Sequence, residues 1–258
     1  MKTRTFAIGD IHGDLSALDR LLSRLPALTD RDTVVFMGDY VDRGPDSRGV
    51  IERVRGLGSS VPARVVLLRG NHEDKWIHCF HHGDPGFLLP PQNGCANLFR
   101  SFAGGPPLAH EESLSRDEMI RFFEVKSWLP PEVVAWMESL PLWYEDDHAI
   151  YVHAGLDGEG TEWKHPSEGR EKQLLWMREP DFFANYHGKQ LVFGHTVVTE
   201  LPLDPVGHRG HLGLFAKLFD DPRDVWVRGD LLGIDTGCGK GGFLSAVELP
   251  GRRVYESR

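Results

Sequence analysis

Short apolar runs recur along the chain, and each one ends at a polar turn rich in glycine. Runs this short, bounded by turn residues, are typical of buried β-strands. The predicted strands are Phe6–Ile8, Thr33–Met37, Arg64–Leu68, Ala149–Val152, Gln190–Phe193 and Leu231–Ile234.

Amphipathic segments separate the first three predicted strands. Asp14–Leu25 places its leucines on one helical face, and Ser47–Leu57 repeats the pattern more weakly. Strands that alternate with helices predict an α/β fold whose sheet has a parallel portion and helices on its faces. Functional groups in such sheets lie at the carboxyl ends of the strands, where the polar turns of this chain occur.

The alternation stops between about residues 74 and 148. Ser115–Glu118 reads as a capping box that opens a helix through Lys126, and Pro130-Pro131 opens a second helix at Glu132–Leu140. We interpret this region as a helical cap over the site, so residues 1–258 are predicted to form a single domain. Pro250-Gly251 predicts a closing hairpin.

Composition narrows the class of protein. Of the 258 residues, 40% are hydrophobic and 26% charged, which is typical of a large globular domain without a membrane span. The N-terminus leaves no room for a signal peptide, and the three cysteines, Cys79, Cys95 and Cys238, are expected to be free thiols in the cytoplasm. A net charge of -9 argues against nucleic acid as a partner.

Polar signatures follow the predicted strands: GDIHG at 9–13, GDYVDRG at 38–44, GNHE at 70–73, HAG at 153–155 and GHT at 194–196. They supply carboxylate and amide oxygens and imidazole nitrogens, the ligands that a pair of divalent ions needs. The candidate ligands are Asp10, His12, Asp39, Asn71, His153 and His195. These six ligands carry two formal negative charges, which would leave two divalent ions with positive charge to hold a phosphoryl group.

Taken together, these motifs resemble the PPP-type metallophosphoesterases of the calcineurin-like superfamily, in the bacterial branch of serine/threonine protein phosphatases. The resemblance spans about residues 4–75, 149–156, 174–178 and 190–237. It implies a four-layer α/β/β/α sandwich with mixed sheets and a helical cap insertion. It also implies two divalent metal ions, for which we expect manganese, with iron or zinc as alternatives.

The resemblance also implies roles for individual residues. Asp10, His12 and Asp39 would hold one ion, and Asp39 would share the other with Asn71, His153 and His195. His72, steadied by Asp42, would donate a proton to the leaving oxygen. The reaction would be direct attack of a bridging hydroxide on phosphorus, with inversion and no phosphoenzyme. The residues expected to hold the phosphate are Arg43, Arg69 and Arg178, with Arg43 also counted as catalytic.

The expected substrate is phosphoserine or phosphothreonine in proteins. The alternatives are a symmetrical dinucleoside tetraphosphate hydrolase, and a broad small-molecule or phosphotyrosine phosphatase. Asp42 and Glu73 favour the protein phosphatase, because the dinucleotide hydrolases typically lack the first and carry aspartate in place of the second. A silent binding module is a further alternative, which the intact ligand set disfavours. The oligomeric state stays open.

Other polar clusters carry weaker signals. His78 and His82 share a helical face but are expected to be solvated, and His208 and His211 are expected to be exposed or structural. Asp235-Thr236-Gly237 is expected to shape the backbone near the site rather than bind metal. Residues of about 203–228 look like an insert that forms a flap or a dimer contact.

Overall fold

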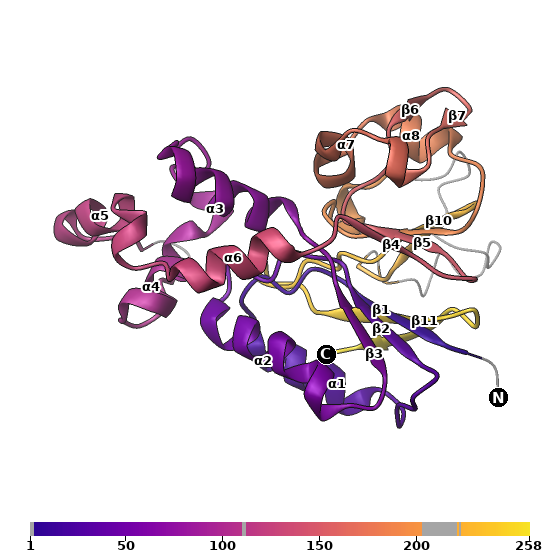
Figure 1. Ribbon diagram of the computed structural model, residues 1–258, viewed down its shortest axis with the longest axis horizontal. Helices are drawn as coiled ribbons and strands as arrows, with labels where there is room; N and C mark the ends of the chain where they lie inside the picture. The colour runs from indigo at the N-terminus through magenta and orange to yellow at the C-terminus, as the bar shows by residue number, and fades with distance from the viewer. Residues whose placement is uncertain (1–2, 110–111, 203–220, 222) are drawn as a thin grey trace.

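Two five-stranded mixed sheets form the centre of the protein (Figure 1). The computed structural model describes residues 3–109, 112–202, 221 and 223–258. The strand order in the first sheet is β12 (Arg253–Glu256), β11 (Ser245–Leu249), β1 (Thr5–Ile8), β2 (Thr33–Phe36) and β3 (Arg64–Leu67). The order in the second sheet is β4 (Trp143–Glu145), β5 (Ile150–Val152), β8 (Leu191–Phe193), β10 (Leu231–Gly233) and β9 (Trp226–Arg228).

Each sheet has a parallel centre. Strands β1, β2 and β3 pair in parallel, with Ile8 opposite Phe36 and Phe36 opposite Leu67, whereas β11 and β12 are antiparallel. In the second sheet β5, β8 and β10 are parallel, and β4 and β9 are antiparallel edge strands. Parallel strands in register end together, so their polar turns leave at one edge of each sheet.

The sheets pack face to face because alternate residues of each strand point to opposite sides. Ala7 and Val35 lie in the core between the sheets, where they join Val192 and Leu232 of the second sheet. Their neighbour Phe6 belongs to the outer core of the first sheet. Both faces are therefore buried, which explains why the sequence shows continuous apolar runs rather than alternation.

Helices complete the outer layers (Figure 1). Helices α1 (Leu15–Arg24) and α2 (Ser47–Ser60) cover the first sheet, and Asp14 caps α1 through the backbone N–H of Ala17. Helices α7 (Glu171–Trp176) and α8 (Pro180–Asn185) cover the second sheet. The predicted α/β/β/α sandwich is therefore confirmed, and the ends of the predicted elements differ from the observed ones by up to three residues.

The segment between the sheets is mainly helical. It contains α3 (Asn71–His82), α4 (Cys95–Ala103), α5 (Arg116–Phe123) and α6 (Pro131–Ser139), with 3-10 turns η1 (Pro91–Asn93) and η2 (Val125–Ser127). The remaining short elements are β6 (Gly158–Glu159), β7 (Glu162–Trp163), η3 (Pro166–Glu168) and η4 (Val198–Glu200).

Three predictions need correction or lie outside the described residues. The helix predicted through Lys126 ends at Phe123, and η2 follows it. The predicted cap range reaches too far, because β4 pairs with β5 in the second sheet. His208, His211 and most of the predicted insert lie outside the described residues, although β9, at its end, is a sheet edge rather than a flap.

The three cysteines are buried free thiols, as predicted. Within the described ranges, the search for apolar helices of membrane-spanning length finds none.

The core between the sheets should carry much of the stability. Leu232 is 1% exposed there, so Leu232→Ala is expected to lower the free energy of unfolding by about 2–5 kcal/mol through lost apolar contact and a residual cavity. Leu89 is 60% exposed, and Leu89→Ala should change the free energy of unfolding by less than about 0.5 kcal/mol. Urea unfolding of both variants tests this, and equal effects would contradict the assignment.

Candidate metal and phosphate site

The polar turns after β1 and β2 are locked against each other by backbone hydrogen bonds. The N–H of His12 donates to the carbonyl of Asp39 at 2.8 Å, and the N–H of Gly44 donates to the carbonyl of His12 at 2.8 Å. Left-handed backbone conformations in non-glycine residues are costly and concentrate at functional sites. In these turns and in the GHT turn they occur at His12, Asp39, Asp42, Arg43 and His195.

The His12 side chain turns an unprotonated nitrogen toward a carboxylate. Its Nδ1 lies 3.0 Å from the carbonyl of Val41, which can only accept, so Nδ1 carries the proton. Burial, followed by the charge of Arg43, lowers the pKa of His12 well below its usual value. Nε2 of the neutral ring lies 3.5 Å from Asp39 Oδ2 and also accepts from the guanidinium of Arg43, so it can bind a metal ion only when Arg43 moves away.

His153 repeats this arrangement on the other side of Asp39. Its Nδ1 donates to the carbonyl of Met37 at 2.8 Å, and burial lowers the pKa of the ring. Its Nε2 faces Asn71 Oδ1 at 2.8 Å and Asp39 Oδ1 at 3.5 Å. Asp39 thus turns one oxygen toward each imidazole, an arrangement compatible with the shared ligand that the sequence analysis predicts.

Asp10 brings a further acceptor to this cluster. Its Oδ2 accepts the backbone N–H of His195 at 2.9 Å, whereas Oδ1 is buried and has no hydrogen-bond partner within the described part of the chain. Ligand atoms of Asp10, Asp39 and His153 lie within 4.8 Å of one another, and so do those of His12, Asp39 and His72. Buried acceptors that face one another are stabilised by cations, so the residues present fit two metal ions.

His195 and Arg178 adopt an arrangement that sequence reasoning missed. The Nε of Arg178 lies 3.0 Å from His195 Nε2, and because a guanidinium can only donate, Nδ1 carries the imidazole proton and points at Asn71 Oδ1, 2.8 Å away. Arg178 also donates to the carbonyl of His195 at 3.2 Å. Nδ1 can act as a metal ligand only when Arg178 leaves Nε2.

His72 is held by a buried carboxylate. Its Nδ1 lies 2.6 Å from Asp42 Oδ2, and Asp42 also accepts from the indole N–H of Trp76 at 2.9 Å. The Cys95 thiol lies 3.7 Å from the same oxygen. These contacts leave His72 Nε2 facing the cluster, 3.9 Å from Asp39 Oδ2. Trp76, four residues after His72 on the same face of α3, was the signal that sequence reasoning missed.

The predicted phosphate-holding arginines differ in position. The guanidinium of Arg43 contacts His12 Nε2 and therefore lies at the cluster. Arg69 has other partners in this structure, and its expected role in holding phosphate stays a prediction. Its guanidinium donates to the carbonyl of Glu138 at 2.6 Å and to Glu171 at 3.3 Å. The cap and α7 supply these acceptors, and a motif cannot reveal that competition.

Glu73 and Asp235 accept hydrogen bonds from backbone N–H groups of the turns that form the site. The Glu73 carboxylate is fully buried and accepts the backbone N–H groups of Asp39, Tyr40 and Gly70, each at 2.9 Å. It therefore joins two of the motif turns. Asp235 accepts the N–H of Gly237 at 3.0 Å, as expected for a residue that shapes the backbone, but its second oxygen is buried without a partner among the described residues.

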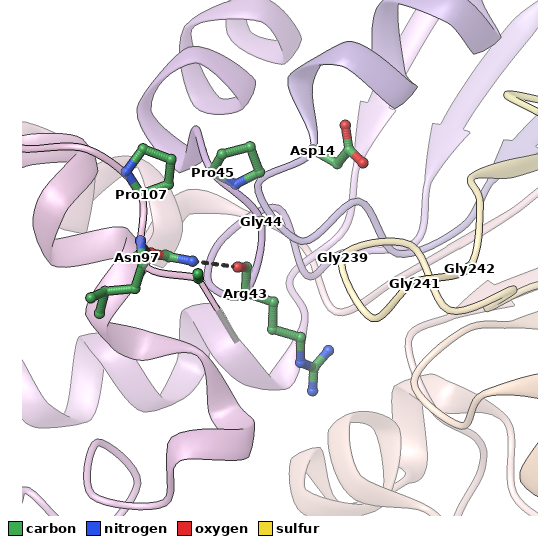
Figure 2. A pocket seen from close by; sticks show the side chains of 11 residues that line it. Asp14, Arg43, Gly44, Pro45, Asn97, Pro107, Gly239, Gly241 and Gly242 are labelled. Carbon is green, nitrogen blue, oxygen red and sulfur yellow. Dashed lines mark hydrogen bonds between the residues drawn. The ribbon is translucent and has the colours of Figure 1, made fainter. Parts of the chain in front are cut away.

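Two separate grooves are each lined by a residue that contacts an imidazole of the cluster, Arg43 in the first and Trp176 in the second. The first, of about 450 Å³, is lined by Arg43, by the cap loop around Pro107 and by the glycine loop 239–242 (Figure 2). Figure 2 shows the Arg43 side chain extending away from the cap residues. The second groove, of about 550 Å³, is lined by Asp74, Lys75, Glu171, Lys172, Leu175 and Trp176.

The remaining histidines of α3 lie at the opposite end of that helix from His72. The rings of His78 and His82 are 4.7 Å apart, and His78 lies 3.7 Å from Asp84. The side chain of His78 is 48% exposed, which agrees with the solvated position that was expected.

Comparison with known proteins identifies the family. The model of the calcineurin-like phosphoesterases matches residues 3–199, which is well over half of the chain. The chain belongs to this family. Its members' reaction class, metal-dependent phosphoester hydrolysis, agrees with the donor set described above.

Curated relatives cover nearly the whole chain. A symmetrical bis(5'-nucleosyl)-tetraphosphatase of Chromohalobacter salexigens is 29% identical over 95% of this chain and 94% of its own length. The enzyme of the same name from Dechloromonas aromatica is 26% identical over 98% of this chain and 95% of its own length.

Solved structures share the fold. A crystal structure provisionally assigned as a diadenosine tetraphosphatase has a TM-score of 0.61 at 21% identity, covering 98% of this chain and 92% of that one. A Saccharomyces cerevisiae protein serine/threonine phosphatase has a TM-score of 0.51 at 18% identity. The match covers 96% of this chain and 73% of that one. At these identities the likeness concerns the fold alone.

The converging acceptors should make stability depend on divalent ions. Mn²⁺ at about 100 times its dissociation constant is expected to add about 2.7 kcal/mol to the free energy of unfolding, or roughly 5–10 °C in Tm. Asp39→Asn should abolish most of this rise, because Asp39 faces both imidazoles. Asp19→Asn, at an exposed position on α1, should keep it. Thermal unfolding after chelation and Mn²⁺ addition tests this, and an unchanged rise in Asp39→Asn would contradict the assignment.

Proposed function

We propose that this metallophosphoesterase hydrolyses symmetrical dinucleoside tetraphosphates into two nucleoside diphosphates. The observation that carries the proposal is that two separate grooves are lined by residues that contact different imidazoles of the acceptor cluster. One reaches the cluster at Arg43, which contacts His12, and the other at Trp176, whose ring centre lies 5.8 Å from that of His195. A substrate with a central polyphosphate and two nucleosides matches this arrangement.

The relatives support the same choice. Enzymes named symmetrical bis(5'-nucleosyl)-tetraphosphatase align along nearly the full length of this chain, including the region between the sheets. The comparisons thus favour the alternative of the sequence analysis over the phosphoprotein phosphatase.

The two residues that favoured a phosphoprotein phosphatase have internal roles. Asp42 is fully buried between His72 and Trp76, and Glu73 is fully buried against three backbone N–H groups. Neither carboxylate faces a groove, so neither can contact the part of a substrate beyond its phosphate. Their identities therefore carry little information about substrate class.

The residues proposed to hold two divalent ions are those of the sequence analysis. Asp10 and His12 would hold one ion, and Asn71, His153 and His195 the other, with Asp39 shared. Carboxylate, amide and imidazole ligands suit manganese, and also iron or zinc. When bound, such ions stabilise charge on phosphoryl oxygens and lower the pKa of a water molecule.

The chain's own residues would complete the reaction. Arg43 and Arg178 can donate to phosphate oxygens, because their guanidinium groups already lie against the imidazoles of His12 and His195. His72, oriented by Asp42, would give its Nε2 proton to the leaving phosphate oxygen as the bond between the central phosphates breaks. Water supplies the oxygen of the new bond to phosphorus.

Parallel assays of diadenosine tetraphosphate and a phosphoserine peptide with added Mn²⁺ test the proposed substrate. We expect kcat/KM for the dinucleotide to exceed that for the peptide by at least about tenfold, a difference of about 1.4 kcal/mol. ADP should be the sole nucleotide product. Turnover of the peptide without cleavage of the dinucleotide would reverse the proposal, and AMP with ATP would exclude symmetrical cleavage.

The proton-donor role of His72 predicts a dependence on the leaving group. His72→Asn should lower kcat for diadenosine tetraphosphate by about 10²–10⁴-fold, and should lower it less for p-nitrophenyl phosphate, whose leaving group needs no proton. The Mn²⁺-induced rise in Tm should persist. His78→Asn, at the exposed end of α3, is the matched control. Equal losses on both substrates would argue that His72 serves the metal centre instead.

A further inference from the structure

The groove beside α7 presents a partly buried indole next to the acceptor cluster. The ring of Trp176 packs edge-on against His195, with ring centres 5.8 Å apart, and against Phe87, at 6.3 Å. Phe87 in turn packs edge-on against His72, at 4.9 Å. Trp176 is therefore fixed in position by residues that belong to the site or touch it, although part of its surface stays open to the groove.

The charges of this groove favour an anion next to the indole. Arg69 lies 3.3 Å from Glu171 and 4.0 Å from Asp74, so its single positive charge offsets part of the charge of these two lining carboxylates. Lys75 Nζ lies over one face of the Trp176 ring, 5.3 Å from its centre, so a base stacks on the other face or displaces the ammonium group. Neither Lys75 nor Lys172 forms an ion pair within the described part of the chain, which leaves two ammonium groups available to phosphate.

An aromatic face flanked by ammonium groups matches one ligand class. Nucleobases stack on indole rings, and their phosphates pair with cations. Building on the proposed function, we propose that the α7 groove binds one nucleoside of the substrate, with the base stacked on Trp176 and the adjoining phosphates near Lys75 and Lys172. A phosphopeptide would supply no base to stack on the ring.

Binding of two probes to the Mn²⁺-loaded enzyme separates the base from the phosphates. Trp176→Leu is expected to weaken ADP binding about tenfold, within the range that loss of one stacked base causes, and to leave binding of inorganic pyrophosphate unchanged. Trp176→Phe keeps an aromatic face and should restore most of the ADP affinity. Isothermal titration calorimetry measures all three.

Each other outcome overturns the inference. Unchanged ADP binding in Trp176→Leu would mean that no base stacks there, and equal weakening of ADP and pyrophosphate would mean that Trp176 supports the phosphate site instead. Failure of the proposed function is distinguishable from both. In that case the wild-type enzyme would leave diadenosine tetraphosphate intact, whereas the ADP and pyrophosphate titrations would still report on the groove.

Discussion

Everything at the site depends on one buried carboxylate held between two imidazoles. Asp39 turns one oxygen toward His12 and the other toward His153, each at 3.5 Å. Both imidazoles donate their Nδ1–H groups to backbone carbonyls, so their Nε2 atoms are turned toward the carboxylate. Positive charge stabilises buried acceptors such as these, and the guanidinium of Arg43 already contacts His12 Nε2.

The two-sheet architecture makes this convergence possible. Asp10 and Asp39 follow parallel strands of the first sheet, whereas His153 and His195 follow parallel strands of the second. Because the strands of each sheet end in register, packing the sheets face to face brings all four turns to one place. The apolar contacts between the sheets therefore serve the chemistry as well as stability.

The segment between the sheets adds His72 and one of the outer walls. Helix α3 begins with Asn71 and His72, and the indole of its Trp76 donates to Asp42. The cap loop around Pro107 lines one groove, and helix α7, which belongs to the second-sheet half, lines the other. The fold is shared by enzymes of one broad reaction class, and walls such as these limit which compounds can reach the cluster.

The sequence by itself determined the α/β alternation, the mixed sandwich and the polar turns, because buried strands need continuous apolar runs and the turns carry recognisable ligand spacing. It could also identify His72 and Asp42 as a pair, and their side chains lie 2.6 Å apart. Only the tertiary structure decided the partners of three other side chains. Arg69 donates to Glu171 and to the carbonyl of Glu138, Arg178 donates to His195, and Glu73 accepts backbone N–H groups. These outcomes depend on competition among partners distant in sequence, which no local pattern encodes.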